Sequence, residues 1–247
     1  MNYRPILLKL YSWISIGLDW IFPPECVGCG LENEHICPSC LENINYIGAQ
    51  ICKICGAPLK YGDQCSNCQK NQPYFNQLRS VATYEGPTRE AIRHLKYKSG
   101  ITLGEPLAKL MYDKVQDQKW NVDLVVPVPL SQKRKSARGY NQAVILAFPL
   151  SLFLNIKYSS DAVFRIKDTK SQVGLNAEAR QENVLNAFRA DRNKVKGKRI
   201  LLVDDVTTTG ATINACAKAL SQADADVIYA ITLAKAVHSK SDLDIDI

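Results

Sequence analysis

Residues 199–212, with the sequence RILLVDDVTTTGAT, carry the residue types best suited to chemistry in this chain. An apolar run ends in two acids, Asp204 and Asp205, and a loop of small residues follows from Thr207 to Thr212. This order predicts a buried strand, a tight turn and a helix start, with the carboxylates and the loop N–H groups at the carboxyl end of the strand. Helix N-termini bind anions, Gly210 permits a positive φ, and carboxylates suit sugar hydroxyls or a divalent cation. The stretch predicts a site for a phosphate beside a ribose; the alternative is an ordinary strand–turn–helix with an acidic N-cap.

Eight of the nine cysteines form four Cys-x-x-Cys pairs within one short segment. Each pair can aim two thiolates at one ion, and two pairs complete a tetrahedral zinc site. A glycine follows the first pair of each half, which favours sequential grouping over an interleaved one. A redox motif or an iron–sulfur cluster is a weaker alternative, because the spacing is typical of zinc ribbons. The expected ligands of two structural zinc ions are Cys26, Cys29, Cys37 and Cys40, then Cys52, Cys55, Cys65 and Cys68.

Two further residues are of types that bind zinc. His35 lies within the first set and could replace a ligand, although four cysteines already suffice. Cys216 stands apart from the pairs and is expected to be a core residue.

A second candidate anion site follows the apolar segment Val122–Pro129. We expect that segment to be a strand and residues 130–142 to be a basic loop entering a helix, at the same sheet edge as the first site. Its four basic residues suit pyrophosphate or nucleic-acid phosphates, and the alternative is a solvent loop; they are Lys133, Arg134, Lys135 and Arg138. In the expected helix 88–97, Arg93, Lys96 and Lys98 could reach an anionic ligand, although a solvated face is the commoner meaning of such charges.

The composition is that of an ordinary globular protein, with 46% hydrophobic and 22% charged residues in 247. The formal net charge of +7 suggests an anionic partner or substrate without proving nucleic-acid binding. Clustered cysteine pairs indicate metal binding in a reducing cytosol, so we expect a cytoplasmic protein.

Four regions are expected along the chain. Residues 1–24 form an amphipathic helix in which Lys9 and Asp19 interrupt the apolar run, so neither a membrane span nor a signal peptide is expected. This helix could dock on its own protein, on a partner or at a membrane surface, and the first is favoured. Residues 25–72 form a double zinc ribbon, 73–238 the main domain and 239–247 a flexible tail. Within the main domain, strands are expected at 78–84 and 225–234 and a helix at 103–115, with a long polar segment near 160–190 that is typical of a lid.

The stretch 199–212 resembles the phosphoribosyl-pyrophosphate (PRPP) loop of type I phosphoribosyltransferases. Together with the cysteine segment, residues 127–130 and 138–142, and the pattern from Arg165 to Phe188, it resembles the ComF/GntX family over nearly the whole chain. The latter half also resembles the transferase domain of glutamine PRPP amidotransferase. The resemblance implies an α/β fold: a type I phosphoribosyltransferase-like parallel sheet flanked by helices, with a small N-terminal double zinc ribbon.

The resemblance also implies roles for individual residues. Asp204 and Asp205 would bind the ribose hydroxyls, directly or around Mg²⁺. The 5′-phosphate would be held by Thr207, Thr208, Thr209, Gly210, Ala211 and Thr212. The segment 131–139 would face the pyrophosphate, and the lid would include Lys170, Gln172 and Arg180.

Family members are associated with DNA uptake and natural transformation, so the implied function is PRPP binding in that process, with single-stranded DNA and a DNA-translocating helicase as partners. One departure limits the prediction of catalysis. Purine-salvage transferases carry an acidic general base in the phosphate loop where this chain has Thr208. A true phosphoribosyltransferase of nucleotide salvage and a non-catalytic adaptor that docks a helicase are the alternatives.

Overall fold

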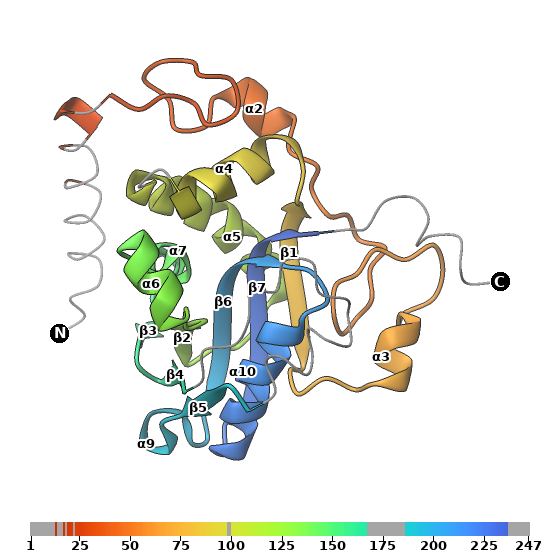
Figure 1. Ribbon diagram of the computed structural model, residues 1–247. Helices are drawn as coiled ribbons and strands as arrows, with labels where there is room; N and C mark the ends of the chain where they lie inside the picture. The colour runs from red at the N-terminus through yellow and green to blue at the C-terminus, as the bar shows by residue number, and fades with distance from the viewer. Residues whose placement is uncertain are drawn as a thin grey trace.

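Five parallel strands form the central sheet in the order β1-β7-β6-β2-β3 (Figure 1). The computed structural model describes residues 13, 17, 19–21, 23–97, 100–166 and 186–236. The strands are β1 Gln77–Thr83, β2 Leu124–Pro127, β3 Lys157–Tyr158, β6 Arg199–Thr207 and β7 Val227–Lys235. Because all five are parallel, their carboxyl ends lie at one edge of the sheet, where ligands of open α/β folds bind.

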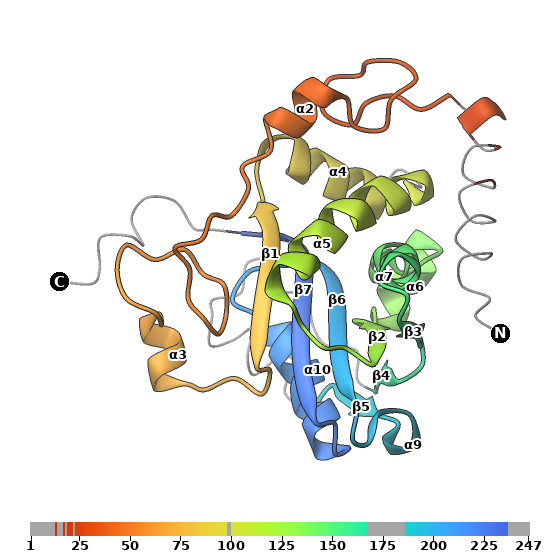
Figure 2. The same cartoon turned by 180° about the vertical axis from the view of Figure 1, so that it is seen from behind.

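Helices cover both faces of this sheet. On one face lie α4 Gly86–Tyr97, α5 Gly104–Gln118, which follows the 3₁₀ turn Ile101–Leu103, and α7 Gln142–Phe153. The other face carries α10 Ala211–Gln222 and the antiparallel pair β4 Val163–Arg165 with β5 Phe188–Ala190, near the short helix α9 Arg192–Val195. Figure 1 shows α10 in front of the sheet, and Figure 2, from behind, shows α5 in front of it. The predicted fold class, a parallel sheet flanked by helices, is confirmed.

The middle strand β6 is buried because its sequence is apolar on both faces. Residues 200–203 are fully buried between β7 and β2. Such a continuous apolar run is expected of a parallel strand that helices cover on both sides. The same strand changes to acids only at Asp204, where it reaches the carboxyl edge.

The cysteine segment covers β1, one of the two edge strands of the sheet. Its short helices are α2 Pro38–Glu42 and α3 Ser66–Lys70. Edge strand β1 donates from Leu78 N to Ile54 O at 2.7 Å and from Thr83 N to Asn45 O at 2.9 Å. These bonds satisfy backbone groups that an open edge would expose to other chains.

One sequence-based expectation is wrong. The segment expected to be a basic loop forms the helix α6 Gln132–Arg138. Ser131 caps this helix, since its Oγ accepts from Arg134 N at 3.3 Å, and Gly139 ends it with φ of 79°. Lysine, arginine and glutamine are good helix formers, so a capping serine and a terminal glycine suffice for a short helix.

Candidate functional site

The segment 204–212 stands at the carboxyl edge of the sheet, as predicted. Strand β6 carries Asp204 and Asp205 to this edge, and the chain turns through residues 208–210 into α10. Gly210 takes φ of 81° at the N-cap of that helix, a conformation that disfavours any residue with a Cβ. The Oγ1 atom of Thr207 is buried without a hydrogen-bond partner among the described residues. A polar atom in that state at a helix N-terminus suits an anion site.

The two acids differ in their surroundings because neighbouring residues of a strand point to opposite faces. Asp205 is buried, and its Oδ2 atom lies 2.8 Å from Lys96 Nζ of α4. Asp204 keeps part of its surface exposed, yet burial and the neighbouring Asp205 carboxylate raise its pKa well above its ordinary value. The site therefore holds more carboxylate than it can easily keep ionised, which favours a ligand bringing hydroxyl donors or a cation.

Lys96 does not lie on a solvent-exposed helix face, which is the commoner position for such a charge. Its side chain is only 16% exposed, whereas Arg93 lies at the surface and pairs with Glu90. Lys98 lies outside the described residues. A signal was present in the sequence: Lys96 follows the buried Ile92 by four residues, so the two share one face of the helix.

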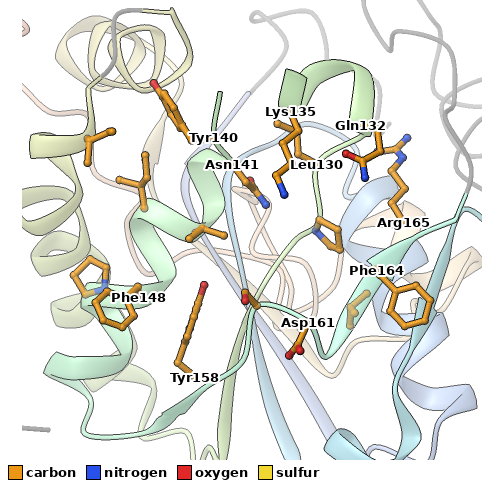
Figure 3. A pocket seen from close by; sticks show the side chains of 17 residues that line it. Leu130, Gln132, Lys135, Tyr140, Asn141, Phe148, Tyr158, Asp161, Phe164 and Arg165 are labelled. Atoms are coloured by element: carbon orange, nitrogen blue, oxygen red, sulfur yellow. The ribbon is translucent and has the colours of Figure 1, made fainter. Parts of the chain in front are cut away.

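The four basic residues of the second predicted site do not form one cluster. Lys135 lines a separate cavity beside α7 (Figure 3), and the guanidinium of Arg138 lies 5.3 Å from the ring of Tyr97 and bonds to Gln142. Lys133 is exposed and Arg134 partly so. Their helix follows β2 at the same sheet edge as the phosphate loop. Their contact with pyrophosphate stays a prediction.

A cavity of about 260 Å³ lies between the loop 207–212 and the second cysteine cluster. Thr209, Gly210 and Lys218 line one side, and Asn67 and Cys68 line the other. The second ribbon thus forms a wall beside the N-terminus of α10. No wall of this kind was evident from the sequence.

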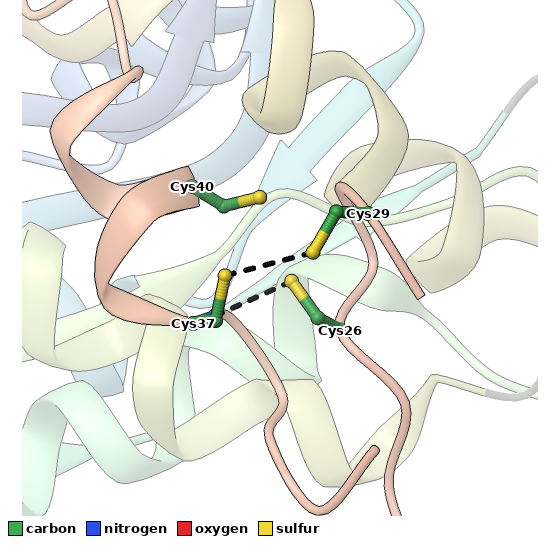
Figure 4. Close-up of side chains that lie close together, drawn as sticks. All are labelled: Cys26, Cys29, Cys37 and Cys40. Atoms are coloured by element: carbon green, nitrogen blue, oxygen red, sulfur yellow. Dashed lines mark hydrogen bonds between the residues drawn. The ribbon is translucent and has the colours of Figure 1, made fainter. Parts of the chain in front are cut away.

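The cysteines form two tetrads, in the sequential grouping that was predicted. Within each tetrad all four sulfur atoms lie within 4.8 Å of one another. The Sγ atoms of Cys29 and Cys37 are 3.6 Å apart, as are those of Cys55 and Cys65. Zinc–sulfur bonds of tetrahedral geometry imply a separation of about 3.8 Å, so both tetrads fit structural zinc. Figure 4 shows the sulfur atoms of the first tetrad turned toward one another.

Backbone N–H groups favour the thiolate form of Cys26, one ligand of the first tetrad. Burial alone would raise the pKa of Cys26, but N–H groups of Cys37 and of its own turn lower it to about 6. A thiolate is the form that zinc binds. His35 is not part of either tetrad: its Nε2 lies 3.0 Å from Asp19 Oδ2.

Arg79 links the second tetrad to the sheet, and sequence reasoning missed it. This β1 side chain is 6% exposed and donates to the carbonyl oxygen of Lys53 at 3.0 Å and to Gln118 Oε1 at 2.9 Å. Burial lowers the pKa of Arg79, whereas the Cys52 and Cys55 thiolates oppose that shift. A buried guanidinium here balances the negative charge of a four-thiolate zinc site.

Both halves of the chain are similar to known protein families. Residues 17–69 match the Double zinc ribbon domain, and residues 102–247 match the Phosphoribosyl transferase domain. Competence protein F of Haemophilus influenzae is 34% identical over 86% of this chain and 97% of its own length. The chain belongs to the ComF/GntX family. Other relatives are DNA utilization protein YhgH of Escherichia coli K12, 32% identical over 83% of this chain and 90% of its own, and Competence protein ComFC of Bacillus subtilis, 29% identical over 76% and 78%.

Two of the solved structures that resemble this ComF-family protein match just over half of it. Glutamine PRPP amidotransferase from B. subtilis shares 17% identity, covering 57% of this chain and 30% of that one, with a TM-score of 0.41. Adenine phosphoribosyltransferase from Thermoanaerobacter pseudethanolicus shares 16% identity over 57% of this chain and 83% of that one, with a TM-score of 0.36.

Some predictions for this ComF-family protein fall outside the described residues. The lid residues Lys170, Gln172 and Arg180, most of the N-terminal helix and the tail 239–247 are among them. Cys216 is fully buried, so its expected place in the core is confirmed. No helix in the described ranges has the length and apolar character that crossing a bilayer requires.

Proposed function

We propose that this protein binds PRPP at the loop 204–212 and acts in the uptake or use of DNA. The observation that carries the binding proposal is the acid pair near the end of β6, followed by a loop of threonines that reaches Gly210, the αL N-cap of α10. The names of its relatives, Competence protein F and DNA utilization protein, support the cellular role.

Two parts of this site bind different groups of the sugar phosphate. Backbone N–H groups of residues 208–212 bind the 5′-phosphate, helped by the dipole of α10. Asp204 and Asp205 accept hydrogen bonds from the ribose hydroxyls. Gly210 allows the loop to approach the phosphate closely.

Lys96 adds a positive charge to this site. Its Nζ atom lies 2.8 Å from Asp205 Oδ2, which fixes one oxygen of that carboxylate and leaves the other to accept from a sugar hydroxyl. The electrostatic balance therefore suits a ligand with both hydroxyls and phosphates.

The acid pair also fits Mg²⁺, which prefers carboxylate oxygens. Burial, and next to it the Asp205 carboxylate, raises the pKa of Asp204 well above its ordinary value, and a bound cation would offset both effects. Asp204 and Asp205 would hold the ion, which supplies charge neutralisation for the diphosphate when bound.

Catalysis is a separate proposal from binding. Transfer would require a nitrogen nucleophile to attack C1 of PRPP while pyrophosphate leaves. Thr208 cannot serve as a general base at neutral pH, so a base from this loop is not available among residues 207–212. Stabilisation of the leaving group would then rest on cations such as those of α6.

The test is a calorimetric titration of the full-length zinc-loaded protein with PRPP and Mg²⁺. We expect the Asp204→Asn plus Asp205→Asn variant to weaken PRPP binding at least about tenfold, the loss of one or two charge-assisted hydrogen bonds. Asp113→Asn is the matched control, because that acid pairs with Lys109 on the exposed surface of α5. Unchanged affinity in the double variant, or no heat from the wild type at millimolar PRPP, would refute the binding proposal.

Two further measurements address the role and the reaction. A deletion strain complemented with the double variant should transform DNA less often than one complemented with Asp113→Asn. Pyrophosphate release across a panel of bases separates a transferase from a binding protein.

A further inference from the structure

The two cysteine tetrads have opposite electrostatic surroundings, although their sulfur atoms are arranged alike. Residues 23–45, which hold the first tetrad, contain four glutamates and neither lysine nor arginine. Residues 50–72, which hold the second, contain Lys53, Lys60 and Lys70 against one acid, Asp63. Four thiolates around one zinc ion carry a net charge of about −2, so nearby charges decide how well each centre is stabilised.

A buried arginine lies against the second tetrad. Arg79 is 6% exposed, and its guanidinium donates to the carbonyl oxygens of Lys53 at 3.0 Å and Ile54 at 3.5 Å. These two residues are the ones that separate Cys52 from Cys55 in the turn. The hydrogen bonds therefore hold the positive charge of Arg79 beside two ligands of this tetrad.

A buried lysine is the second cation near this tetrad. Lys235, at the carboxyl end of β7, is 8% exposed, and its side chain has no hydrogen bond or ion pair with any described residue. Burial raises the pKa of Cys55 to about 11, and Lys235 is the first of the influences that oppose this rise. A buried ammonium needs a charge of opposite sign nearby, which a four-thiolate zinc centre supplies.

The first tetrad has no comparable cations. The pKa values of Cys26 and Cys40 are shifted by burial, by backbone N–H groups and by the other thiols, and no lysine or arginine is among the main causes. His35 lies in the same ribbon, but its ring is paired with Asp19. The charge of this thiolate centre is therefore not balanced by neighbouring side chains within residues 23–45.

Acids add negative charge around the first tetrad instead. Glu25 and Glu32 face each other in an antiparallel bridge, and Glu25 directly precedes the ligand Cys26. Glu34 and Glu42 are exposed on the same ribbon. Like charges close together destabilise one another, so thiolates in this ribbon are stabilised less than those of the second.

Solvent reaches only the first tetrad freely. Cys29 is exposed, whereas the other seven zinc ligands are buried or half-buried. Its Sγ atom lies 3.6 Å from that of Cys37 (Figure 4). Oxidation of cysteine follows thiolate character and exposure, and a neighbouring thiol allows a disulfide to form.

We infer that the first tetrad is a modification site at which neutral hydroperoxides oxidise Cys29, and that Arg79 and Lys235 protect the second. An uncharged oxidant is not repelled by the glutamates around the first tetrad.

The oxidation has two steps. Cys29 Sγ attacks one peroxide oxygen, the O–O bond breaks, a hydroxide ion leaves, and Cys29 becomes a sulfenic acid. Cys37 Sγ then attacks the Cys29 sulfur, the S–S bond forms and the second hydroxide leaves. The two thiolates lose two electrons and the peroxide gains them. The tetrad then lacks two of its four thiolates and loses its affinity for zinc.

The test is treatment of the full-length zinc-loaded protein with hydrogen peroxide, while a chromogenic chelator reports the zinc released. We expect one zinc ion per chain to be released at least about tenfold faster than the other. Peptide mass spectrometry should find the first disulfide between Cys29 and Cys37.

Removal of acids from the first ribbon should slow the fast phase. Glu25→Gln plus Glu32→Gln should slow it about threefold, because two nearby negative charges are lost. Asp224→Asn plus Asp226→Asn is the matched control, since it removes two exposed acids from the turn before β7 and should leave both phases unchanged.

Removal of the buried cation should speed the slow phase. Arg79→Met should speed zinc release from the second tetrad about tenfold, while Arg79→Lys, which keeps the charge, should retain most of the protection. The fast phase should be the same in both variants.

Equal release rates for the two zinc ions, or a first disulfide within residues 52–68, would overturn the proposal. An Arg79→Met variant that folds and keeps the slow phase at its wild-type rate would also overturn it. If Arg79→Met does not fold, the glutamate variants decide, because an unchanged fast phase in Glu25→Gln plus Glu32→Gln would refute the electrostatic difference between the tetrads.

Discussion

Lys96 Nζ lies 2.8 Å from Asp205 Oδ2, with side-chain exposures of 16% and 4%. The pair joins α4 to the end of β6, two elements distant in the chain. It places a fixed cation in the candidate site before any ligand arrives.

Loss of Lys96 should destabilise the protein more than a surface charge does. Lys96→Met leaves the Asp205 carboxylate buried and unpaired, which should lower the free energy of unfolding by roughly 2–4 kcal/mol. Denaturant titration of the zinc-loaded protein measures this. The double variant Lys96→Met, Asp205→Asn should recover part of the loss. Arg93→Met is the control, because its pair with Glu90 is exposed; an equal loss there would contradict the assignment.

Two glycines at equivalent places in the ribbons should differ in their tolerance to alanine. Gly30 and Gly56 have φ of 78° and 64°. A Cβ on Gly30 meets no atom within 4 Å, whereas one on Gly56 would lie 2.6 Å from the carbonyl oxygen of Leu78.

Gly30→Ala should therefore cost only the backbone strain, about 1 kcal/mol. Gly56→Ala adds a clash with β1 and should cost about 3 kcal/mol. Thermal unfolding of both variants at saturating zinc checks this. Equal costs would mean that the second ribbon is not seated against β1 as described.

Removal of zinc should open the edge of the sheet before its centre. The amide of Leu78 bonds to Ile54 of the second ribbon, and that of Thr83 bonds to Asn45. A strong chelator should speed hydrogen exchange at both amides, while Leu201 and Leu202 in buried β6 stay protected.

Variants of single tetrads sharpen this prediction. Cys65→Ser should speed exchange at Leu78 more than at Thr83, because Ile54 belongs to the second tetrad's turn. Zinc added back to the chelated wild type should restore protection. Uniform exchange throughout the sheet would instead indicate global unfolding.

The ion pair between Arg199 and Asp123, at the amino ends of β6 and β2, should make stability fall in acid. Arg199 donates from its NH2 and Nε atoms to the two carboxylate oxygens of Asp123 at 2.6 and 2.9 Å, which lowers the pKa of Asp123 to about 2. A carboxyl group whose pKa is lowered on folding stabilises the folded protein at pH values above its ordinary pKa of 3.8. This stabilisation is lost as the pH falls toward about 2, the pKa of Asp123 in the folded protein.

The measurement is the difference in melting temperature between wild type and Asp123→Asn. At pH 5–7 we expect the wild type to melt about 1–3 °C higher than Asp123→Asn. The difference is small because both side chains are partly exposed. It should shrink between pH 4 and pH 2. Asp113→Asn, which removes an exposed pair with Lys109, is the control, and a constant difference over this range would contradict the role of the Asp123 pair.

The sequence by itself determined the parts of this protein whose signals are local. An apolar run followed by two acids and a glycine predicts β6, the loop and α10, because strand burial and helix capping depend on neighbouring residues. The spacing of the cysteine pairs predicts both tetrads for the same reason: each pair is a single turn. The domain boundaries and the lid remain predictions.

Only the tertiary structure decided which distant side chains meet. Lys96 was one basic residue among several on its helix until the packing of α4 placed it against Asp205. The charges of the basic segment 130–142 predict a loop, and that prediction is wrong. Ser131 caps the first turn and Gly139 ends the last, so residues 132–138 form a helix. The covering of β1 by the ribbons and the cavity beside α7 arise from contacts between separate elements, and no local pattern of residues specifies such contacts.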